Sequence, residues 1–69
     1  MYRYYCIMRP PMIGGLPYGK TIQNVEAFTE RRYNPEIDRM AWGWVEYMEE
    51  LTMQEVADYE LIAAPREDA

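Results

Sequence analysis

The stretch GGLPYGKT, from Gly14 to Thr21, matches the phosphate-binding loop pattern G-x-x-x-x-G-K-[ST] letter for letter. In a working loop of this kind, backbone N–H groups and a helix N-terminus converge on the phosphates of a nucleotide. That geometry needs a strand directly before the loop and a helix directly after it. Here PPMI precedes the glycine-rich stretch, and Pro17 removes one backbone donor from the loop. We therefore interpret the match as accidental and predict a Gly/Pro-rich turn that binds no nucleotide.

Residues that usually carry acid–base, nucleophilic or metal chemistry are scarce in this chain. It has no histidine, the side chain whose ordinary pKa lies closest to neutral pH. Cys6 is the only cysteine, so an internal disulfide is excluded, and a zinc site would have to combine one thiol with carboxylates. No imidazole is available to activate Cys6, which we expect to be a small buried hydrophobe. We predict a non-enzymatic protein with no catalytic residue, no metal and no cofactor.

Basic and aromatic side chains of the N-terminal half define one candidate site. Proteins hold single-stranded nucleic acid by stacking its bases on aromatic rings beside cations that neutralise the phosphates. The net charge of −5 opposes a general nucleic-acid binder. Single-strand binding is therefore the alternative function, and its candidate residues are Arg3, Arg9, Arg31, Arg32 and Tyr5.

The C-terminal half provides a second candidate site, which is acidic. Residues 1–35 carry a charge balance of +3, whereas residues 36–69 carry a balance of −8. An acidic surface beside tryptophans suits docking onto a basic protein, including one that handles nucleic acid. The candidate residues for this docking are Glu46, Glu49, Glu50 and Trp42. A competing interpretation, which we favour for the asymmetry itself, is that the two halves neutralise each other across the fold.

Alternation with a period of two predicts strands in the N-terminal half. Residues 2–9 (YRYYCIMR) form the first, and two prolines end it because neither can donate a backbone hydrogen bond. A Pro/Gly-rich loop is expected over 10–24, either functional or mobile, and a second strand over 25–33. The better core face of the first strand comprises Tyr2, Tyr4, Cys6 and Met8.

Residues 35–51 allow two interpretations. As a helix, the segment has Asn34 as its N-cap and apolar residues at helical spacing. As a strand, MAWGWVEYM concentrates Trp, Val and Tyr around Gly43, and such residues suit a pleated surface. A glycine also costs a helix interior about 1 kcal/mol. We favour a turn through 34–39 and a strand at 40–48, with a helix across 35–51 as the alternative.

The stretch LTMQEV marks the start of a helix. Thr52 and Glu55 have the spacing of a capping box, in which each side chain accepts a hydrogen bond from the other residue's backbone N–H. A short helix is therefore predicted over 53–58. The alternating YELIAA follows it, and the tail at 65–69 is expected to fray.

Length and composition predict one α+β domain over 1–69, with an antiparallel sheet of three to four strands and one short helix. The 49% of apolar residues are enough for one core, and the six methionines are expected mainly to fill it. A domain this small often needs a further stabiliser, so we expect a homodimer or a bound protein partner. Neither a signal-like stretch nor an 18-residue apolar run is present. We expect a cytoplasmic protein without membrane contact.

Three stretches of the chain resemble those of a known group of proteins: YYCIMRPPMIGGLPYG, PEIDRMAWGWVEY and LTMQEVADYEL. The group comprises small proteins encoded on prophages and conjugative elements of Gram-positive gut bacteria. It carries no agreed catalytic motif, so the resemblance implies no site residues. In size and charge the chain is also similar to inhibitors of host defence, such as anti-CRISPR and anti-restriction proteins. The resemblance implies an accessory protein of a mobile element, and together with the similarity in size and charge it favours an interaction module that inhibits a nucleic-acid-handling defence complex.

Overall fold

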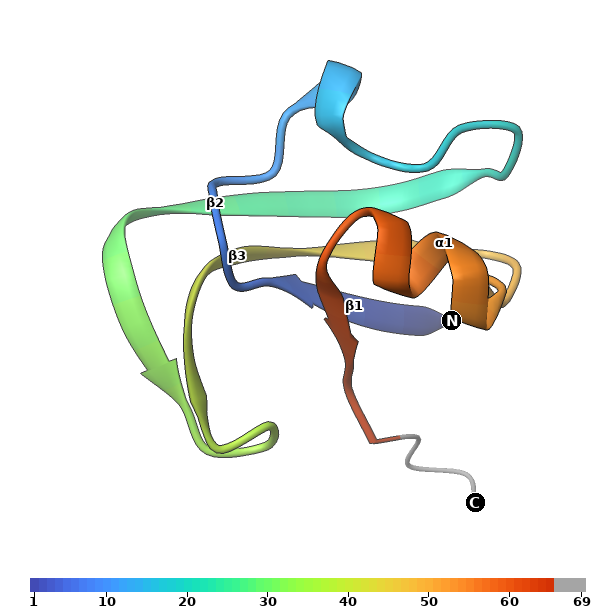
Figure 1. Cartoon of the computed structure of the whole chain (residues 1–69). Helices are drawn as coiled ribbons and strands as arrows, with labels where there is room; N and C mark the ends of the chain where they lie inside the picture. The colour runs from blue at the N-terminus through green and yellow to red at the C-terminus, as the bar shows by residue number, and fades with distance from the viewer. Residues whose placement is uncertain (66–69) are drawn as a thin grey trace.

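The computed structural model describes residues 1–65 and shows a four-stranded antiparallel sheet with one short α-helix (Figure 1). The strand order is β2-β3-β1-β4, so β2 and β4 form the two edges. This arrangement confirms the predicted small α+β fold. The expected frayed tail at 65–69 falls outside the described residues except for Pro65. The elements are β1 (Tyr2–Cys6), the 3-10 helix η1 (Ile13–Gly15), β2 (Ile22–Asn34), β3 (Arg39–Tyr47), α1 (Met53–Asp58) and β4 (Leu61–Ala63).

β1 lies between β3 and β4 and is shorter than predicted, because it ends at Cys6 rather than at residue 9. Tyr4 and Cys6 are buried on the predicted face, and Tyr2 packs against them. Met8 lies beyond the strand and is 58% exposed, so its assignment to the core was wrong. After the strand, the chain leaves the sheet and crosses over it as the loop that contains η1.

Residues 39–47 form β3, one of the two inner strands of the sheet, so the alternative prediction of a helix across 35–51 was wrong. The preceding turn begins at Asn34, whose carbonyl oxygen accepts hydrogen bonds from the backbone N–H groups of Ile37 and Asp38. β3 pairs with β1 on one side and β2 on the other, so its Trp, Val and Tyr side chains lie on a pleated surface, as their residue types favour. Val45 and Tyr47 are fully buried.

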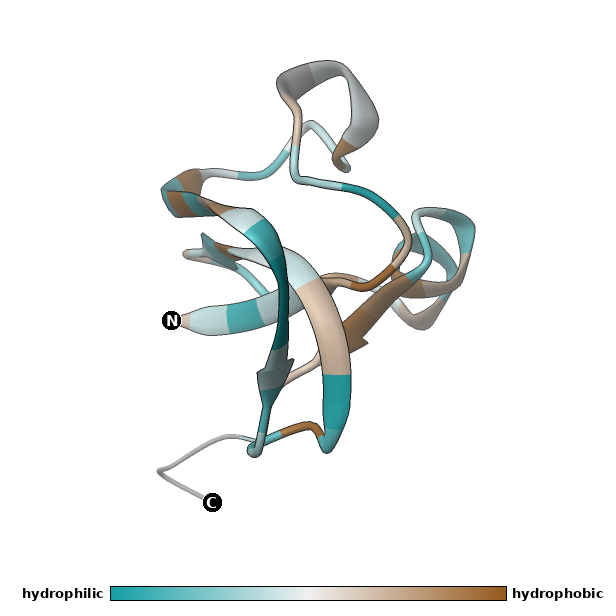
Figure 2. Ribbon diagram, turned by 90° about the vertical axis from the view of Figure 1, so that its left-hand side faces the viewer, coloured by the Kyte–Doolittle hydropathy of each residue, from teal (hydrophilic) through white to brown (hydrophobic). Residues whose placement is uncertain are grey.

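β2 is the longest strand and begins at Ile22, inside the segment that was expected to be loop. Between its pairs with Gly43 and Ala41 of β3, it places four residues opposite one, which is a large bulge. β2 and β3 bend together at this point (Figure 1). In a view from the side of this hairpin, β2 shows largely hydrophilic colours (Figure 2).

The core lies on one face of the sheet, beneath α1 and the loop of residues 7–21. The rings of Tyr4 and Tyr47 meet edge to face, with their centroids 6.2 Å apart. Gly43 lies where this face, β2 and the loop converge. A Cβ at this position would come within 2.2 Å of the Glu26 carbonyl oxygen and 2.7 Å of Pro11 Cδ, so only glycine fits. The buried apolar cluster comprises Tyr4, Cys6, Leu16, Val45, Tyr47, Leu51 and Leu61.

α1 spans the predicted residues, and the predicted capping box is confirmed. The Thr52 hydroxyl oxygen accepts a 3.1 Å hydrogen bond from the Glu55 N–H, and Glu55 Oε1 accepts a 2.8 Å bond from the Thr52 N–H. Glu60, with a positive φ of 55°, follows the helix and precedes β4. Within residues 1–65, no helix has the length and apolar character needed to cross a membrane.

Candidate protein-interaction surface

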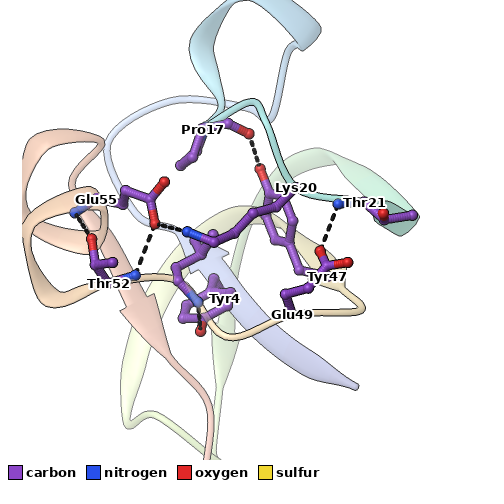
Figure 3. Close-up of polar contacts among 9 residues, drawn as sticks. Tyr4, Pro17, Lys20, Thr21, Tyr47, Glu49, Thr52 and Glu55 are labelled. Atoms are coloured by element: carbon purple, nitrogen blue, oxygen red, sulfur yellow. Dashed lines mark hydrogen bonds and ion pairs between the residues drawn. The ribbon is translucent and has the colours of Figure 1, made fainter.

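The GGLPYGKT loop is fixed to β3 and α1 by its own polar groups (Figure 3). The hydroxyl of the fully buried Tyr47 donates a 2.5 Å hydrogen bond to the Pro17 carbonyl oxygen. Lys20 Nζ lies 2.5 Å from Glu55 Oε1, the same oxygen that accepts from the Thr52 N–H. One carboxylate therefore serves both the helix cap and the loop.

The segment after β3 is attached to the same loop. The Thr21 N–H donates a 2.7 Å hydrogen bond to Glu49 Oε1, and the Met48 N–H donates a 2.9 Å bond to the Thr21 carbonyl oxygen. Hydrogen bonds from the Lys20 ammonium and from the Thr52 N–H lower the pKa of Glu55 below its usual range, and the positive charge of Lys20 adds to the effect. Glu55 is therefore ionised near neutral pH, which suits its contact with the Lys20 ammonium.

These contacts do not form the geometry of a phosphate-binding loop. The stretch leads into strand β2, whereas a phosphate-binding loop leads into the helix whose N-terminus receives the phosphates. The lysine is engaged by Glu55, and Pro17 is buried in contact with the core. The motif instead provides a turn that closes one side of the core.

The fixed backbone presents a set of exposed side chains at this end of the molecule. Tyr18 is 86% exposed, Met53 is 90% exposed and Met48 is 50% exposed. Glu49 and Glu50 are exposed beside Met48 and add negative charge. We name this set, Tyr18, Met48, Glu49, Glu50 and Met53, the loop–helix surface.

All six methionines of the chain are exposed, with fractions between 40% and 90%. The expectation that they fill the core was therefore wrong. The core space is taken instead by Tyr, Val and Leu side chains. Flexible, polarisable methionine side chains adapt to different partner shapes, and their exposure is typical of contact surfaces.

The structure separates the four predicted acidic-site residues. Glu49 and Glu50 lie on the loop–helix surface, but Glu46 and Trp42 lie on the sheet face opposite the core. There Glu46 Oε2 accepts hydrogen bonds of 3.0 and 2.7 Å from Nε and Nη2 of Arg3. Burial alone would raise the pKa of Glu46, but hydrogen bonds from Arg3 and Asn24 lower it below the usual value. The Glu46 carboxylate is therefore occupied by contacts within the protein.

The predicted basic-aromatic residues are also brought into internal contacts. Arg3 stacks over the Trp44 ring at 4.1 Å in addition to its pairing with Glu46. Tyr5 is only 5% exposed, and its hydroxyl donates a hydrogen bond to Glu36 of the β2–β3 turn. Burial, followed by this hydrogen bond, raises the pKa of Tyr5. Members of both predicted sites, Arg3, Tyr5 and Glu46, therefore share one sheet face, where the charges of Arg3 and Glu46 offset each other.

Ion pairs among the described residues all join the first half of the chain to the second. These pairs are Arg3 with Glu36 and Glu46, Arg9 with Glu60, and Lys20 with Glu55. For them, the favoured interpretation that the two halves neutralise each other across the fold is confirmed. Arg31 and Arg32 instead lie exposed on β2, where Arg32 stacks over the Phe28 ring at 4.2 Å.

Cys6 is buried in the core, as predicted. Burial raises the pKa of its thiol to about 11, so the nucleophilic thiolate is strongly disfavoured at neutral pH. Sequence reasoning missed Met48 and Met53 of the loop–helix surface. The available signal was positional, since Met48 follows the last buried residue of an alternating strand and Met53 follows a helix N-cap directly.

The fold and these surfaces define the class of the molecule: a small α+β domain whose two most exposed large apolar side chains, Tyr18 and Met53, lie on segments that flank exposed acids. A family model described as "Defence against restriction A C-terminal" matches residues 1–66, and the chain belongs to that family. The expected anti-restriction-like character is confirmed at the level of the family. The prophage or conjugative-element source stays a prediction. No curated protein and no solved structure matches the chain.

Proposed function

We propose that the chain is a non-enzymatic protein-interaction module that inhibits a nucleic-acid-handling defence complex by docking onto it. The family supports a role in defence against restriction. The observation that carries the docking proposal is the loop–helix surface, where exposed Tyr and Met side chains lie on the segments that flank the exposed acids Glu49 and Glu50.

The chemistry of this surface fits a basic partner. Enzymes that act on nucleic acid present cationic surfaces to the phosphate backbone. An acidic, partly apolar surface can occupy such a region, with charge guiding the approach and the apolar side chains supplying most of the contact energy. Tyr18 is the best anchor because it offers a large aromatic side chain at little entropic cost.

The backbone beneath the surface is held in place, which also favours docking. The hydrogen bonds of Pro17, Thr21 and Glu55 fix both segments before any partner arrives. A preorganised surface loses less conformational entropy on binding than a flexible loop does.

Single-stranded nucleic-acid binding is the weaker candidate. Of its predicted residues, Arg3 and Arg9 are already paired with carboxylates, and Tyr5 is buried. Arg31 and Arg32 are accessible on β2, but they lie beside Glu30 and Phe28 rather than along an aromatic platform.

The test compares two tagged variants that change charge equally. One carries Tyr18→Ala, Glu49→Gln and Glu50→Gln, and its control carries Thr29→Ala and Glu30→Gln on β2 together with Asp38→Asn in the turn that follows it. Each is used to capture proteins from a host lysate after nuclease treatment, and captured proteins are identified by mass spectrometry. The captured enzyme is then assayed for DNA cleavage with and without the chain.

We expect the wild type and the β2 control to retain a basic defence protein and to inhibit its cleavage of DNA. The loop–helix variant should lose both effects. Equal inhibition by the two variants would contradict the assignment of the surface, and inhibition by none of the proteins would contradict the function.

A further inference from the structure

β2 is an edge strand whose side chains are mostly accessible. It forms thirteen residues of strand, and eleven of them are exposed. It pairs with β3 on one side, whereas no strand among residues 1–65 pairs with its outer side. The opposite edge, β4, has only three residues. A long edge with unpaired backbone donors and acceptors is a template for another strand.

The charges along β2 differ in kind from those of the loop–helix surface. Two acids, Glu26 and Glu30, are matched by two bases, Arg31 and Arg32, so the strand has no net charge. Neither Glu26 nor Arg31 takes part in an ion pair within the described part of the chain. The loop–helix surface, being acidic, would repel a second copy of itself, but β2 would not.

The bulge decides which side chains of β2 share a face. Glu26 lies opposite Trp44 and Arg32 lies opposite Ala41, and these two β3 residues point to opposite faces of the sheet. Glu26 and Arg32 therefore point to opposite faces as well. Arg31 is the last residue of the bulge, and strand alternation from its paired neighbour Arg32 places it on the face of Glu26.

We propose that two copies of the chain associate through β2, in an antiparallel, two-fold pair in which Glu26 of each copy faces Arg31 of the other. A two-fold interface uses the same surface on both copies, so each such contact occurs twice. Directly opposed, oppositely charged side chains stabilise an antiparallel pair. The bends of the two strands also fall close together in this register, because the contact is centred between Phe28 and Thr29, within the bulge.

Neighbouring registers are worse. A shift of one residue in one direction places Glu26 opposite Arg32, which points to the other face. A shift in the other direction places Glu26 opposite Glu30, where like charges repel. Of these three registers, only the proposed one places oppositely charged side chains opposite each other on the same face of the sheet.

The test is a charge exchange between copies, followed by sedimentation velocity over a wide range of protein concentration. Glu26→Arg alone creates Arg–Arg contacts in a homodimer, and Arg31→Glu alone creates Glu–Glu contacts. A mixture of the two variants, however, forms two Arg–Glu contacts in a heterodimer. Glu50→Arg, which makes the same charge change on the loop–helix surface, is the matched control. Circular dichroism verifies that each variant is folded.

We expect the wild type and Glu50→Arg to sediment as dimers at high concentration. Each β2 variant alone should dimerise at least tenfold more weakly, and mixing the two should restore dimers. A wild type that stays monomeric at every concentration would overturn the proposal and leave β2 free for a strand of another protein. Dimers that are insensitive to both β2 variants would overturn it as well.

Discussion

β3 has β1 on one side and β2 on the other, and the surroundings of these two neighbours differ. The three consecutive residues Tyr4, Tyr5 and Cys6 of β1 are buried, under the core on one face and the β2–β3 turn on the other. In β2, only Phe28 and Asn34 are buried. Both strands pair with the same partner, so the difference comes from what covers them.

The comparison indicates that stability and contact are carried by different parts of the molecule. The β1–β3 side holds the apolar cluster, the buried tyrosine hydroxyls and the fixed loop. The outer side of β2 and the loop–helix surface hold accessible side chains that few internal contacts constrain. Substitutions on the first side should therefore unfold the protein, whereas those on the second should change its associations.

Gly43→Ala should have the largest effect on stability, because Gly43 joins the two sides. The new methyl group would overlap the Glu26 carbonyl oxygen and Pro11, so the backbone of β2 or the loop would have to move. We expect a loss of about 3 kcal/mol in the free energy of unfolding, measured by urea denaturation. Gly14→Ala is the control, because its added Cβ meets no atom within 4 Å. Equal losses in both variants would contradict the close packing at Gly43.

The variants Tyr47→Phe and Tyr33→Phe each delete a tyrosine hydroxyl oxygen, the first on the β1–β3 side and the second on β2. Tyr47 is fully buried and its hydroxyl satisfies the Pro17 carbonyl, so we expect a loss of about 1–2 kcal/mol. Tyr33 is 52% exposed on β2, and its hydroxyl bonds Asp38 within reach of water, so its loss should be near zero. Thermal melting of the two variants measures the difference. A larger loss for Tyr33→Phe would reverse the assignment of the stable side.

Thr52→Ala removes the acceptor for the Glu55 N–H at the start of α1. The expected cost is about 1 kcal/mol, which lowers the melting temperature of a domain this small by several degrees. Thr52→Ser, which keeps the hydroxyl, should retain most of the stability. An unchanged melting temperature for Thr52→Ala would show that the cap does not support the fold.

Acidification should weaken the Arg3–Glu46 pair on the sheet face opposite the core. The pKa of Glu46 is lowered in the folded protein, so its contribution is present above the ordinary value of 4.5 and is lost as pH falls through the lowered pKa. The contribution of this partly exposed pair is at most about 1 kcal/mol. Melting temperatures of Glu46→Gln should fall less steeply below pH 4.5 than those of the wild type. Glu30→Gln, on exposed β2, should keep the wild-type slope, and identical slopes in all three proteins would contradict the pairing.

The sequence predicted the elements whose signals are local. The capping box at Thr52 and Glu55 depends on two residues three positions apart, and the helix begins where it indicates. The strand at 39–47 followed from Trp, Val and Tyr, residue types that favour a pleated surface. The early end of β1 was not predictable, because the strand ends where Cys6 pairs with Gly43 of β3 and Leu61 of β4, which are distant in the chain.

The composition of the candidate site was less accessible to sequence reasoning. The charges of both predicted sites were identified, but their mutual pairing depends on the register of β1 with β3, which places Arg3 opposite Glu46. Methionine is compatible with both core and surface, so its exposure could not be inferred from residue type. The bulge in β2 likewise has no local signature in FTER, residues 28–31, which form it.

The central claim, that the exposed surfaces bind protein rather than nucleic acid, is tested most directly by fluorescence anisotropy. A labelled single-stranded oligonucleotide is titrated with the chain at low and at moderate salt. Because Arg3, Arg9 and Lys20 are already paired with carboxylates, we expect no saturable binding at either salt concentration. Micromolar binding that weakens steeply with salt, with a log–log slope of about −0.7 per phosphate contacted, and that disappears in Arg31→Ala/Arg32→Ala would contradict the account.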